Sequence, residues 1–232
     1  INKILIGNDI IDLSLAKIES NWQRSGFLEK QFTEHEQKLI FESPNPFILV
    51  WKFWSMKESA YKVYTQQDKV RFFAPKKFNC ILISEKEGLV NFKNQTFYTS
   101  SIITQDYIFT LASKEITIKA YSKLVMPKFI DRVIKTKLQD LTAFPAEEIK
   151  QKKTKNKVPL YYYKNILLTK SCSISHHGNY GVFSLLYPLI MTNTNTTPGI
   201  SPNKKIIHHL LDTSLKKKMD FKLTPGGPIY TK

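Results

Sequence analysis

The stretch WSMKESAYK, residues 54–62, sets charged residues among aromatic and apolar ones at helical spacing. At 3.6 residues per turn, the segment from about residue 47 to 65 predicts a helix with one apolar face. The residues of that face are Leu49, Phe53, Met56, Ala60 and Val63. The opposite side carries Trp51, Trp54, Glu58, Tyr61 and Lys62, and Lys57 lies at its flank. We therefore expect a helix that packs on a core and presents charged groups on its other side.

Two interpretations of this charged side are open. Glu58 and Lys62 are four residues apart, and such a pair on a solvated helix contributes only about 0.2–0.5 kcal/mol. The two tryptophans on the same side instead indicate that something covers it. A covered carboxylate is unfavourable unless a cation neutralises it, and either Lys62 or a divalent metal ion would serve.

A second candidate carboxylate lies in the stretch IGNDIID, residues 6–12. Residues 3–6 predict a buried strand that leads into a turn, and Asp9 follows it. Gly-Asn-Asp is common turn chemistry, so Asp9 could simply cap this turn. It could also join Glu58, because Mg²⁺ is typically held by one or two carboxylates with phosphate and water. Asp9 and Glu58 would then bind metal, and Lys57 and Lys62 would bind phosphate.

The first part of the chain predicts helices followed by a sheet. Ser14 could cap a short helix, and Thr33 with Glu36 three residues on predicts a capping box at the start of a helix over 32–43. From Asp68 to residue 122, short β-branched and aromatic runs indicate an antiparallel sheet that covers the helices. This pattern is typical of an α+β fold.

We place the boundaries of the chain's units at residues 122 and 191. The first half covers 1–122, and the second half, 123–191, contains a helix over 129–141, another short helix that opens at Pro145, and strands near 158–163 and 180–190. Residues 192–232 form a polar linker and a basic tail, with a short helix over 206–218.

Composition limits the possible partners and locations. The chain has 35 basic and 19 acidic residues, a formal net charge of +16, which favours anionic partners. Its two cysteines, Cys80 and Cys172, show neither a disulfide framework nor a metal-binding spacing, as expected in a reducing compartment. No apolar run approaches membrane-spanning length, and no signal-peptide pattern opens the sequence. We expect a soluble, cytoplasmic protein with no membrane association.

These residues resemble the motifs of the 4'-phosphopantetheinyl transferase superfamily. The family has a Gly-x-Asp unit after a strand, then a Phe-Ser/Thr-x-x-Glu stretch, then a W-x-x-K-E-x-x-x-K helix. The corresponding residues here are Gly7-Asn8-Asp9, Phe32–Glu36 and Trp54–Lys62, in the same order. Three linked motifs are far more specific than any one of them.

The second half is similar to the family in two further places. The stretch SISHHGNYGVFSL, residues 173–185, resembles a Ser-Leu-Ser-His segment and assigns its roles to Ser175 and His176. The stretch NKVPLYYY, residues 156–163, resembles a Gly-Lys-Pro-x-Leu stretch and points to Lys157, although glycine is absent and Val158 is inserted.

The resemblance implies a fold of two similar α+β halves that form a pseudo-dimer, each an antiparallel sheet packed with helices. The halves are of the holo-acyl-carrier-protein-synthase kind, in the order opposite to that of the surfactin-synthetase-activating type. The implied reaction moves the 4'-phosphopantetheine arm of coenzyme A to a serine of an apo acyl or peptidyl carrier protein and leaves 3',5'-ADP.

The resemblance also implies the site. Mg²⁺ would be held by Asp9 and Glu58, and coenzyme A would be bound by Lys57, Lys62, Ser175, His176 and Lys157. Glu58 and Lys62 would be the catalytic residues, with Glu58 as the best candidate to take the serine proton. The partners would be coenzyme A and an acidic carrier protein, and the pseudo-dimer makes a monomer plausible.

Two alternatives compete with this interpretation. A charge of +16 with many aromatic residues also suits a nucleic-acid-binding protein, but no helix-turn-helix, RNP or zinc-finger signature is present, so we expect no nucleic acid partner. The chain could also be a relative of the family that has no transfer activity and acts as an interaction protein. The presence of Asp9, Lys57, Glu58 and Lys62 argues against that alternative.

Overall fold

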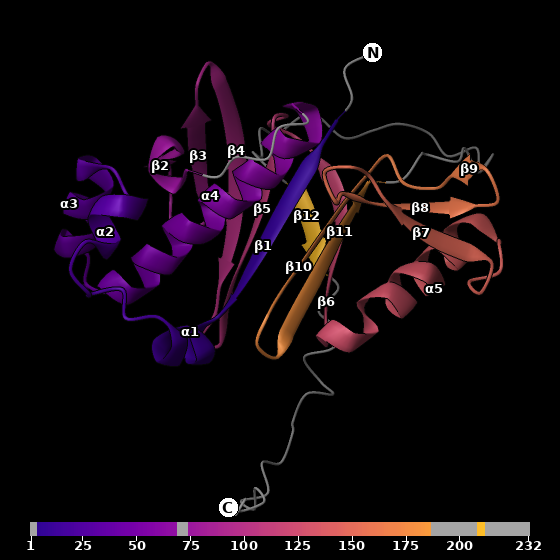
Figure 1. The fold of residues 1–232 in the computed structure, drawn as a ribbon, viewed down its shortest axis with the longest axis horizontal. Helices are drawn as coiled ribbons and strands as arrows, with labels where there is room; N and C mark the ends of the chain where they lie inside the picture. Colours follow the sequence, from indigo (N-terminus) through magenta and orange to yellow (C-terminus); the bar gives the residue numbers. More distant parts are fainter. Residues whose placement is uncertain (1–3, 69–73, 187–207, 212–232) are drawn as a thin grey trace, which may run out of the picture.

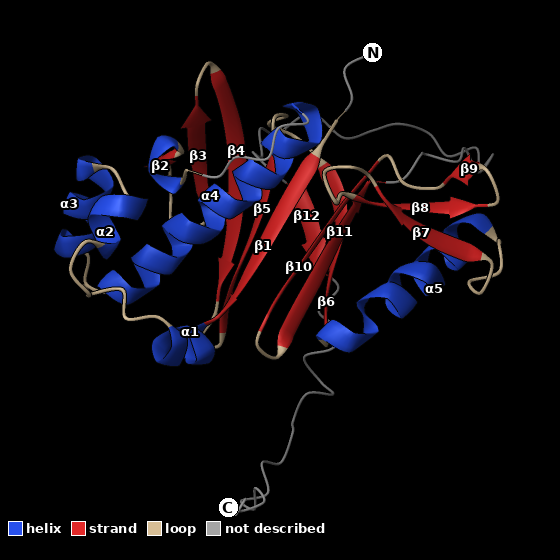
Figure 2. Ribbon diagram, viewed as in Figure 1, coloured by secondary structure: helices blue, strands red, loops and turns tan. Residues whose placement is uncertain are grey.

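The chain, described by a computed structural model for residues 4–68, 74–186 and 208–211, forms an α+β fold in which helices flank two sheets (Figure 1). The first sheet has five strands in the order β1-β5-β4-β3-β2 and is antiparallel throughout. The second has four, in the order β10-β11-β6-β12, and a third has three, β7-β8-β9. Figure 2 shows the strands in the centre with helices on both outer sides.

The first half supplies the helices on one side. Its helices are α1 (Leu13–Glu19), α2 (Phe27–Gln31), α3 (Glu34–Glu42) and the long α4 (Pro46–Asp68), with a short 3-10 turn at Pro75–Lys77. Its strands are β1 (Ile6–Asp12), β2 (Asn79–Leu82), β3 (Glu87–Phe92), β4 (Gln95–Ile103) and β5 (Tyr107–Ser113). The predicted helix at 47–65 is confirmed and extends further at its C-terminal end.

The second half has one principal helix, α5 (Ile130–Thr142), after the strand β6 (Lys119–Val125) and a 3-10 turn at Pro127–Phe129. The strands β7 (Ile149–Lys153), β8 (Pro159–Tyr163), β9 (Ile166–Leu167), β10 (Ser171–His177) and β11 (Tyr180–Leu186) follow. The strand β12 (His208–Leu211) runs parallel to β6. The strand order β6-β11-β10 repeats the order β1-β5-β4. In the first sheet β1 pairs with β5 of the hairpin β4-β5, and in the second β6 pairs with β11 of the hairpin β10-β11.

The two sheets pack through β1. One face of β1 lies under α4, and its other face joins a buried cluster that links the two halves; the cluster consists of Ile6, Ile10, Phe109, Leu111, Ile118, Ala120, Val182 and Leu186. Separate apolar clusters lie under α4 and under α5. Because β1 is covered on both faces, all seven of its residues are buried.

The capping prediction for α3 is confirmed, and the one for α1 is wrong. Thr33 and Glu36 exchange hydrogen bonds with each other's backbone N–H groups in a capping box. The side chain that caps α1 is Asp12 rather than Ser14, and it accepts from the backbone N–H groups of Ser14 and Leu15.

Three other expectations need correction. The change of sheet falls between β5 and β6, not at residue 122, because β6 pairs with β11. The stretch after Pro145 forms turns and then β7 rather than a helix. Residues 208–211 of the expected helix at 206–218 are a strand paired with β6, and the rest of 192–232 lies outside the described residues. No helix in the described part of the chain is long and apolar enough to cross a membrane.

Candidate active site

The site begins with the close approach of α4 to β1, which depends on Gly7. A Cβ at Gly7 would lie 2.1 Å from the carbonyl oxygen of Ser59, so a larger residue would push the helix off the strand. Gly7, Asn8 and Asp9 lie inside the strand β1, so the turn predicted at these residues is wrong. The glycine serves the packing of a helix on a strand rather than a tight turn.

Asp9 points toward α4 and meets Lys62 there. Lys62 Nζ donates to Asp9 Oδ1 at 3.1 Å and to the Asn8 carbonyl oxygen at 2.7 Å. The other carboxylate oxygen, Asp9 Oδ2, is buried and has no hydrogen-bond partner among the described residues. Burial raises the pKa of Asp9 above its ordinary value of 3.8, although Lys62, then the nearby Ser55 hydroxyl and, least strongly, His177 oppose this effect. Asp9 thus carries an oxygen that is ready for a further cation.

Glu58 is the second carboxylate of this group. Burial and then the charge of Asp9 raise the pKa of Glu58 from 4.5 to about 7, and Lys62 lowers it only in part. The effect of the Asp9 charge on Glu58, with Lys62 acting on both, indicates that the two carboxyl groups lie near each other. Within the described residues Glu58 has neither a hydrogen bond nor an ion pair of its own. Two carboxylates and a single ammonium leave this site short of positive charge.

The protein offers two carboxylates for a Mg²⁺ ion, Asp9 and Glu58, and the remaining ligands would have to come from substrate phosphate and water. No group of three or more His, Cys, Asp or Glu side chains in the described ranges is arranged to hold a metal ion. Two carboxylates are nevertheless what Mg²⁺ commonly takes from a protein when substrate phosphate and water fill its other positions. The unpartnered Asp9 Oδ2 and the raised pKa of Glu58 are the signs of a place for such a cation.

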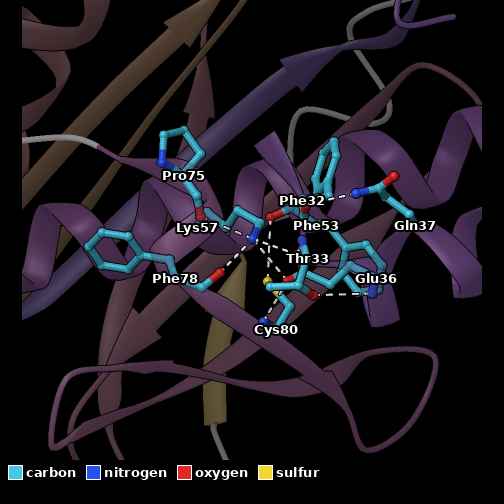
Figure 3. A network of polar contacts seen from close by, with 9 residues as sticks. All are labelled: Phe32, Thr33, Glu36, Gln37, Phe53, Lys57, Pro75, Phe78 and Cys80. Atoms are coloured by element: carbon cyan, nitrogen blue, oxygen red, sulfur yellow. Dashed lines mark hydrogen bonds and ion pairs between the residues drawn. The ribbon is translucent and has the colours of Figure 1, made fainter. Parts of the chain in front are cut away.

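Lys57 occupies a different place from the predicted one. Its side chain is fully buried, and Nζ donates to Glu36 Oε1 at 2.9 Å, to Glu36 Oε2 at 2.8 Å and to the carbonyl oxygens of Pro75 and Phe78 (Figure 3). Lys57 therefore lies on the core side of α4 and pairs there with Glu36, and its contacts in this structure give no support to the predicted phosphate-binding role.

Glu36 joins three parts of the first half. Besides Lys57, its carboxylate accepts from the backbone N–H of Thr33 at 2.7 Å and from the backbone N–H of Cys80 at 2.7 Å. A buried ion pair is costly to desolvate, and removal of one partner alone is strongly destabilising. The Phe-Thr-x-x-Glu and Lys-Glu motifs therefore meet in one structural pair, which ties α3, α4 and β2 together.

The second half reaches the site through β10, which lies alongside β1. Backbone N–H groups of β1 donate to β10 side chains: Ile6 to Ser171 Oγ at 3.1 Å, Asn8 to Ser173 Oγ at 2.8 Å, and Asp12 to His177 Nδ1 at 2.9 Å. Asn8 is completely buried, and its amide group adds bonds to the Ser173 carbonyl oxygen and to Ser184 Oγ. These bonds place alternate residues of β10 against β1.

The alternation along β10 places Ser175 toward β1 and His176 away from it. Ser175 Oγ is buried without a hydrogen-bond partner in the described ranges, whereas His176 is exposed. His177 is the histidine that faces the site, with Nε2 3.5 Å from Glu19 Oε2. Ser175 and His177 therefore lie on the face of β10 toward β1, and His176 lies on the opposite face, because successive side chains of a strand point to opposite faces.

A cavity of about 420 Å³ lies between the C-terminal end of α4 and the second half. It is lined by Gln66, Thr154, Lys155, Asn156, Val158, Leu160, Lys170 and Ser171. Lys157 is exposed beside it, at a positive φ of 60°. Two lysines that the motif comparison did not single out, Lys155 and Lys170, supply the positive charge of this cavity.

Several residues of the site had weak or absent signals in the sequence. Ser171 and Ser173 accept hydrogen bonds from Ile6 and Asn8 of the other half. The only sign of these bonds in the sequence was a serine at every second position of the strand. His177 stands next to the histidine that the motif indicated. Only a strand register separates the two candidates.

Comparison with known protein families gives a match to the first half of the chain. Residues 5–112 match the family model described as the 4'-phosphopantetheinyl transferase superfamily. The matched segment contains Asp9, Glu58 and Lys62. No curated protein matches the sequence.

Two solved structures are similar over about half of the chain. The apo-ACPS structure from Chronobacterium ammoiniagenes shares 14% identity at a TM-score of 0.40, covering 47% of this chain and 94% of that one. The holo-[acyl-carrier-protein] synthase (AcpS) from Neisseria meningitidis shares 10% identity at a TM-score of 0.37, with coverage of 47% and 94%.

Proposed function

We propose that this protein transfers the 4'-phosphopantetheine moiety of coenzyme A to a serine of an apo acyl or peptidyl carrier protein, with Mg²⁺ as cofactor and 3',5'-ADP as product. The observation that carries the proposal is the meeting of Asp9, Glu58 and Lys62 between β1 and α4, within a segment of the superfamily. The reducing, cytoplasmic location and the monomeric state expected from the sequence are part of the proposal.

Asp9 and Glu58 are the residues that would hold the cation. Asp9 offers the unpartnered Oδ2, and Glu58 offers a carboxylate that no described residue neutralises fully. When bound, Mg²⁺ supplies positive charge to the pyrophosphate and to the phosphoryl group in transfer. The protein's own contribution is to keep both carboxylates in place.

Lys62 orients Asp9 and contributes charge. Two of its three N–H groups go to Asp9 Oδ1 and the Asn8 carbonyl oxygen, and the third remains for a phosphate oxygen of coenzyme A. Its side chain is 28% exposed, so a ligand can reach it. A fixed ammonium next to the transferred group stabilises developing negative charge without reorganisation.

Glu58 is also the proposed acceptor of the serine proton. The pKa of about 7 belongs to the metal-free protein, and Mg²⁺ bound to the same carboxylate would lower it, so the role rests on the position of Glu58 beside Lys62 rather than on this value. This role requires the carrier serine to approach Glu58 from the side of α4 that faces solvent, where Glu58 and Lys62 are half-buried rather than covered.

The cavity with Lys155 and Lys170 is the proposed place for the nucleotide end of coenzyme A. Gln66 lines it and lies one helical turn beyond Lys62, so an extended ligand can run from the cavity along α4 to Lys62. Lys157 lies beside the cavity, whereas Ser175 and His177 lie further along β10, toward the Asp12 end of β1. We propose that His177, rather than His176, contributes to the site at that end. Lys57 has no contact with the ligand in this proposal.

The pseudo-dimer is proposed on the strand order. The sequence of pairings β1-β5-β4 in the first sheet recurs as β6-β11-β10 in the second, and a helix follows the first strand in both. The second half additionally contains the small sheet β7-β8-β9, so the likeness is one of connectivity rather than of every element.

The test is the mass of an apo carrier protein after incubation with this protein, coenzyme A and Mg²⁺. We expect a gain of one phosphopantetheine arm, which is lost with EDTA and with Glu58→Gln or Asp9→Asn. Glu115→Gln, which removes an exposed carboxylate elsewhere, serves as the matched control and should leave the gain unchanged. Absence of any gain with acyl and peptidyl carriers would refute the proposed function and favour a relative that acts as an interaction protein.

A further inference from the structure

The small sheet β7-β8-β9 has one covered face and one open face. Its covered face packs on α5, where Ile149 and Tyr161 are fully buried in a cluster with Ile134 and Leu138. In Figure 1 this sheet and α5 form the outer end of the second half. No helix or strand of the described ranges covers the opposite face with a comparable apolar cluster.

The register of the strands decides which side chains share the open face. Lys150 pairs with Tyr162, which pairs with Leu167, and Lys152 pairs with Leu160. Directly opposed residues of antiparallel strands point to the same face. These five residues, here called the open face, alternate with the buried Ile149 and Tyr161. Both lysines are exposed, and Leu167 is 41% exposed, so the face joins positive charge to an apolar centre.

The segment around this face carries a strong positive field. Residues 149–186 contain no aspartate, glutamate or arginine. Their seven lysines are all exposed: Lys150, Lys152, Lys153, Lys155, Lys157, Lys164 and Lys170. Like charges of this density raise the free energy of the folded chain unless an anionic partner is present, so a field of this kind suits binding rather than stability.

The aromatic rings of the sheet argue against a nucleic acid. Single-stranded nucleic acids bind such surfaces by stacking bases on accessible rings. Of the five residues of the open face, Tyr162 alone is aromatic, and Lys152 Nζ lies over its ring at 5.1 Å. Tyr163 belongs to the covered face, since it pairs with Ile149 and stacks on Phe144 with 4.0 Å between ring centroids. A single ring offers no series of stacking platforms for successive bases. An acidic protein surface with an apolar residue at its centre matches what remains, since Leu160 and Leu167 offer apolar contact and the lysines offer charge.

The open face lies next to the proposed site. Leu160 belongs both to this face and to the lining of the cavity. Asn156, in the turn between β7 and β8, donates from Nδ2 to the Thr65 carbonyl oxygen at 2.8 Å, three residues beyond Lys62 on α4. A protein bound to the open face is therefore held beside this cavity and near the C-terminal part of α4.

We propose that the open face of β7-β8-β9 docks the acidic carrier protein through Lys150 and Lys152, with Leu160, Tyr162 and Leu167 as its apolar centre. The inference rests on the proposed function, because it takes the carrier of that reaction as the occupant. It predicts that these side chains determine carrier affinity and leave the transfer step itself unchanged.

The experiment compares the wild type with the double variant Lys150→Glu, Lys152→Glu. We expect the KM for the carrier to rise about tenfold or more, since charges at the edge of an interface act on encounter with the partner. The kcat and the KM for coenzyme A should stay within about twofold. The double variant Lys86→Glu, Lys114→Glu, with the same change in net charge at exposed sites of the first half, should leave the carrier KM within about twofold.

A second pair of variants and a direct binding assay separate the possible failures. Lys150→Gln, Lys152→Gln should give a smaller rise in carrier KM, and Leu167→Ser should raise it without a change in charge. Binding of the apo carrier without coenzyme A, measured by fluorescence anisotropy, should weaken in parallel. Since this assay needs no transfer, it decides the docking proposal even if the proposed function fails.

Three results would overturn the docking proposal. The first is a carrier KM and affinity that the charge reversal leaves unchanged. The second is a rise in the KM for coenzyme A instead, which would assign these lysines to the nucleotide. The third is loss of binding to single-stranded DNA or to phosphatidylserine vesicles with unaltered carrier binding, which would give the face to another class of partner.

Discussion

Replacing Glu58 by glutamine should stabilise the metal-free protein at pH 8 while it abolishes transfer. Burial and the charge of Asp9 raise the pKa of Glu58 to about 7, so ionised Glu58 is unfavourable in the folded state. Glutamine has nearly the same shape and carries no charge. The variant removes the penalty without making a cavity.

The magnitude and sign follow from the pKa. A rise from 4.5 to about 7 corresponds to about 3 kcal/mol, at about 1.4 kcal/mol for each pH unit. Between these two pH values the folded protein binds more protons at Glu58 than the unfolded chain does. The free energy of unfolding of the wild type therefore falls as the pH rises through this window, and the loss is complete above about pH 7. Because Glu58 is partly exposed and interacts with Asp9, we expect a gain of about 1–3 kcal/mol from Glu58→Gln at pH 8.

The assay is urea denaturation at pH 8 and at pH 5 in the presence of EDTA. The difference between Glu58→Gln and the wild type should be about 1–3 kcal/mol at pH 8 and much smaller at pH 5, where the wild-type carboxyl is mostly protonated. Added Mg²⁺ should raise the stability of the wild type at pH 8 more than that of Glu58→Gln. Glu115→Gln should show neither effect. A Glu58→Gln variant that is less stable than the wild type at pH 8 would refute the placement of Glu58 beside an ionised Asp9.

Three further predictions concern the support of the site. Gly7→Ala should cost about 3 kcal/mol of unfolding free energy, because its Cβ would overlap the backbone of α4; urea denaturation checks this, and a near-neutral result would contradict the packing. Lys57→Met should lower the free energy of unfolding, measured by urea denaturation, by about 3–5 kcal/mol, because it leaves Glu36 buried and unpaired. The double variant Lys57→Met, Glu36→Leu should recover part of this loss. A Lys57→Met variant as stable as the wild type would contradict the buried ion pair. His177→Ala should cost about 1–2 kcal/mol by removing an acceptor of a backbone N–H, whereas thermal melts of His176→Ala should match the wild type; the reverse order would show that the register of the strand is different.

The sequence alone was sufficient where the signal is local. The capping box of Thr33 and Glu36 needs only residues three apart, and the period of α4 places Phe53, Met56, Ala60 and Val63 in the core. The three motifs, in order, also pointed to the superfamily whose model residues 5–112 match. Spacing along one helix was enough to place Glu58 and Lys62 on the same side.

The tertiary structure decided the rest, because the deciding contacts join residues far apart in the chain. Lys57 and Lys62 are both lysines of one helix, and only the packing of α3 and β2 shows that Lys57 is neutralised by Glu36 while Lys62 faces Asp9. His176 and His177 are neighbours, and only the pairing of β10 beside β1 shows which of them points inward. Asn8 looked like a turn residue because its sequence is turn-like, yet its partners, Ser173 and Ser184, come from the other half. A sequence pattern reports which face of an element is apolar, whereas the partner of a buried polar group depends on which distant element packs against that face.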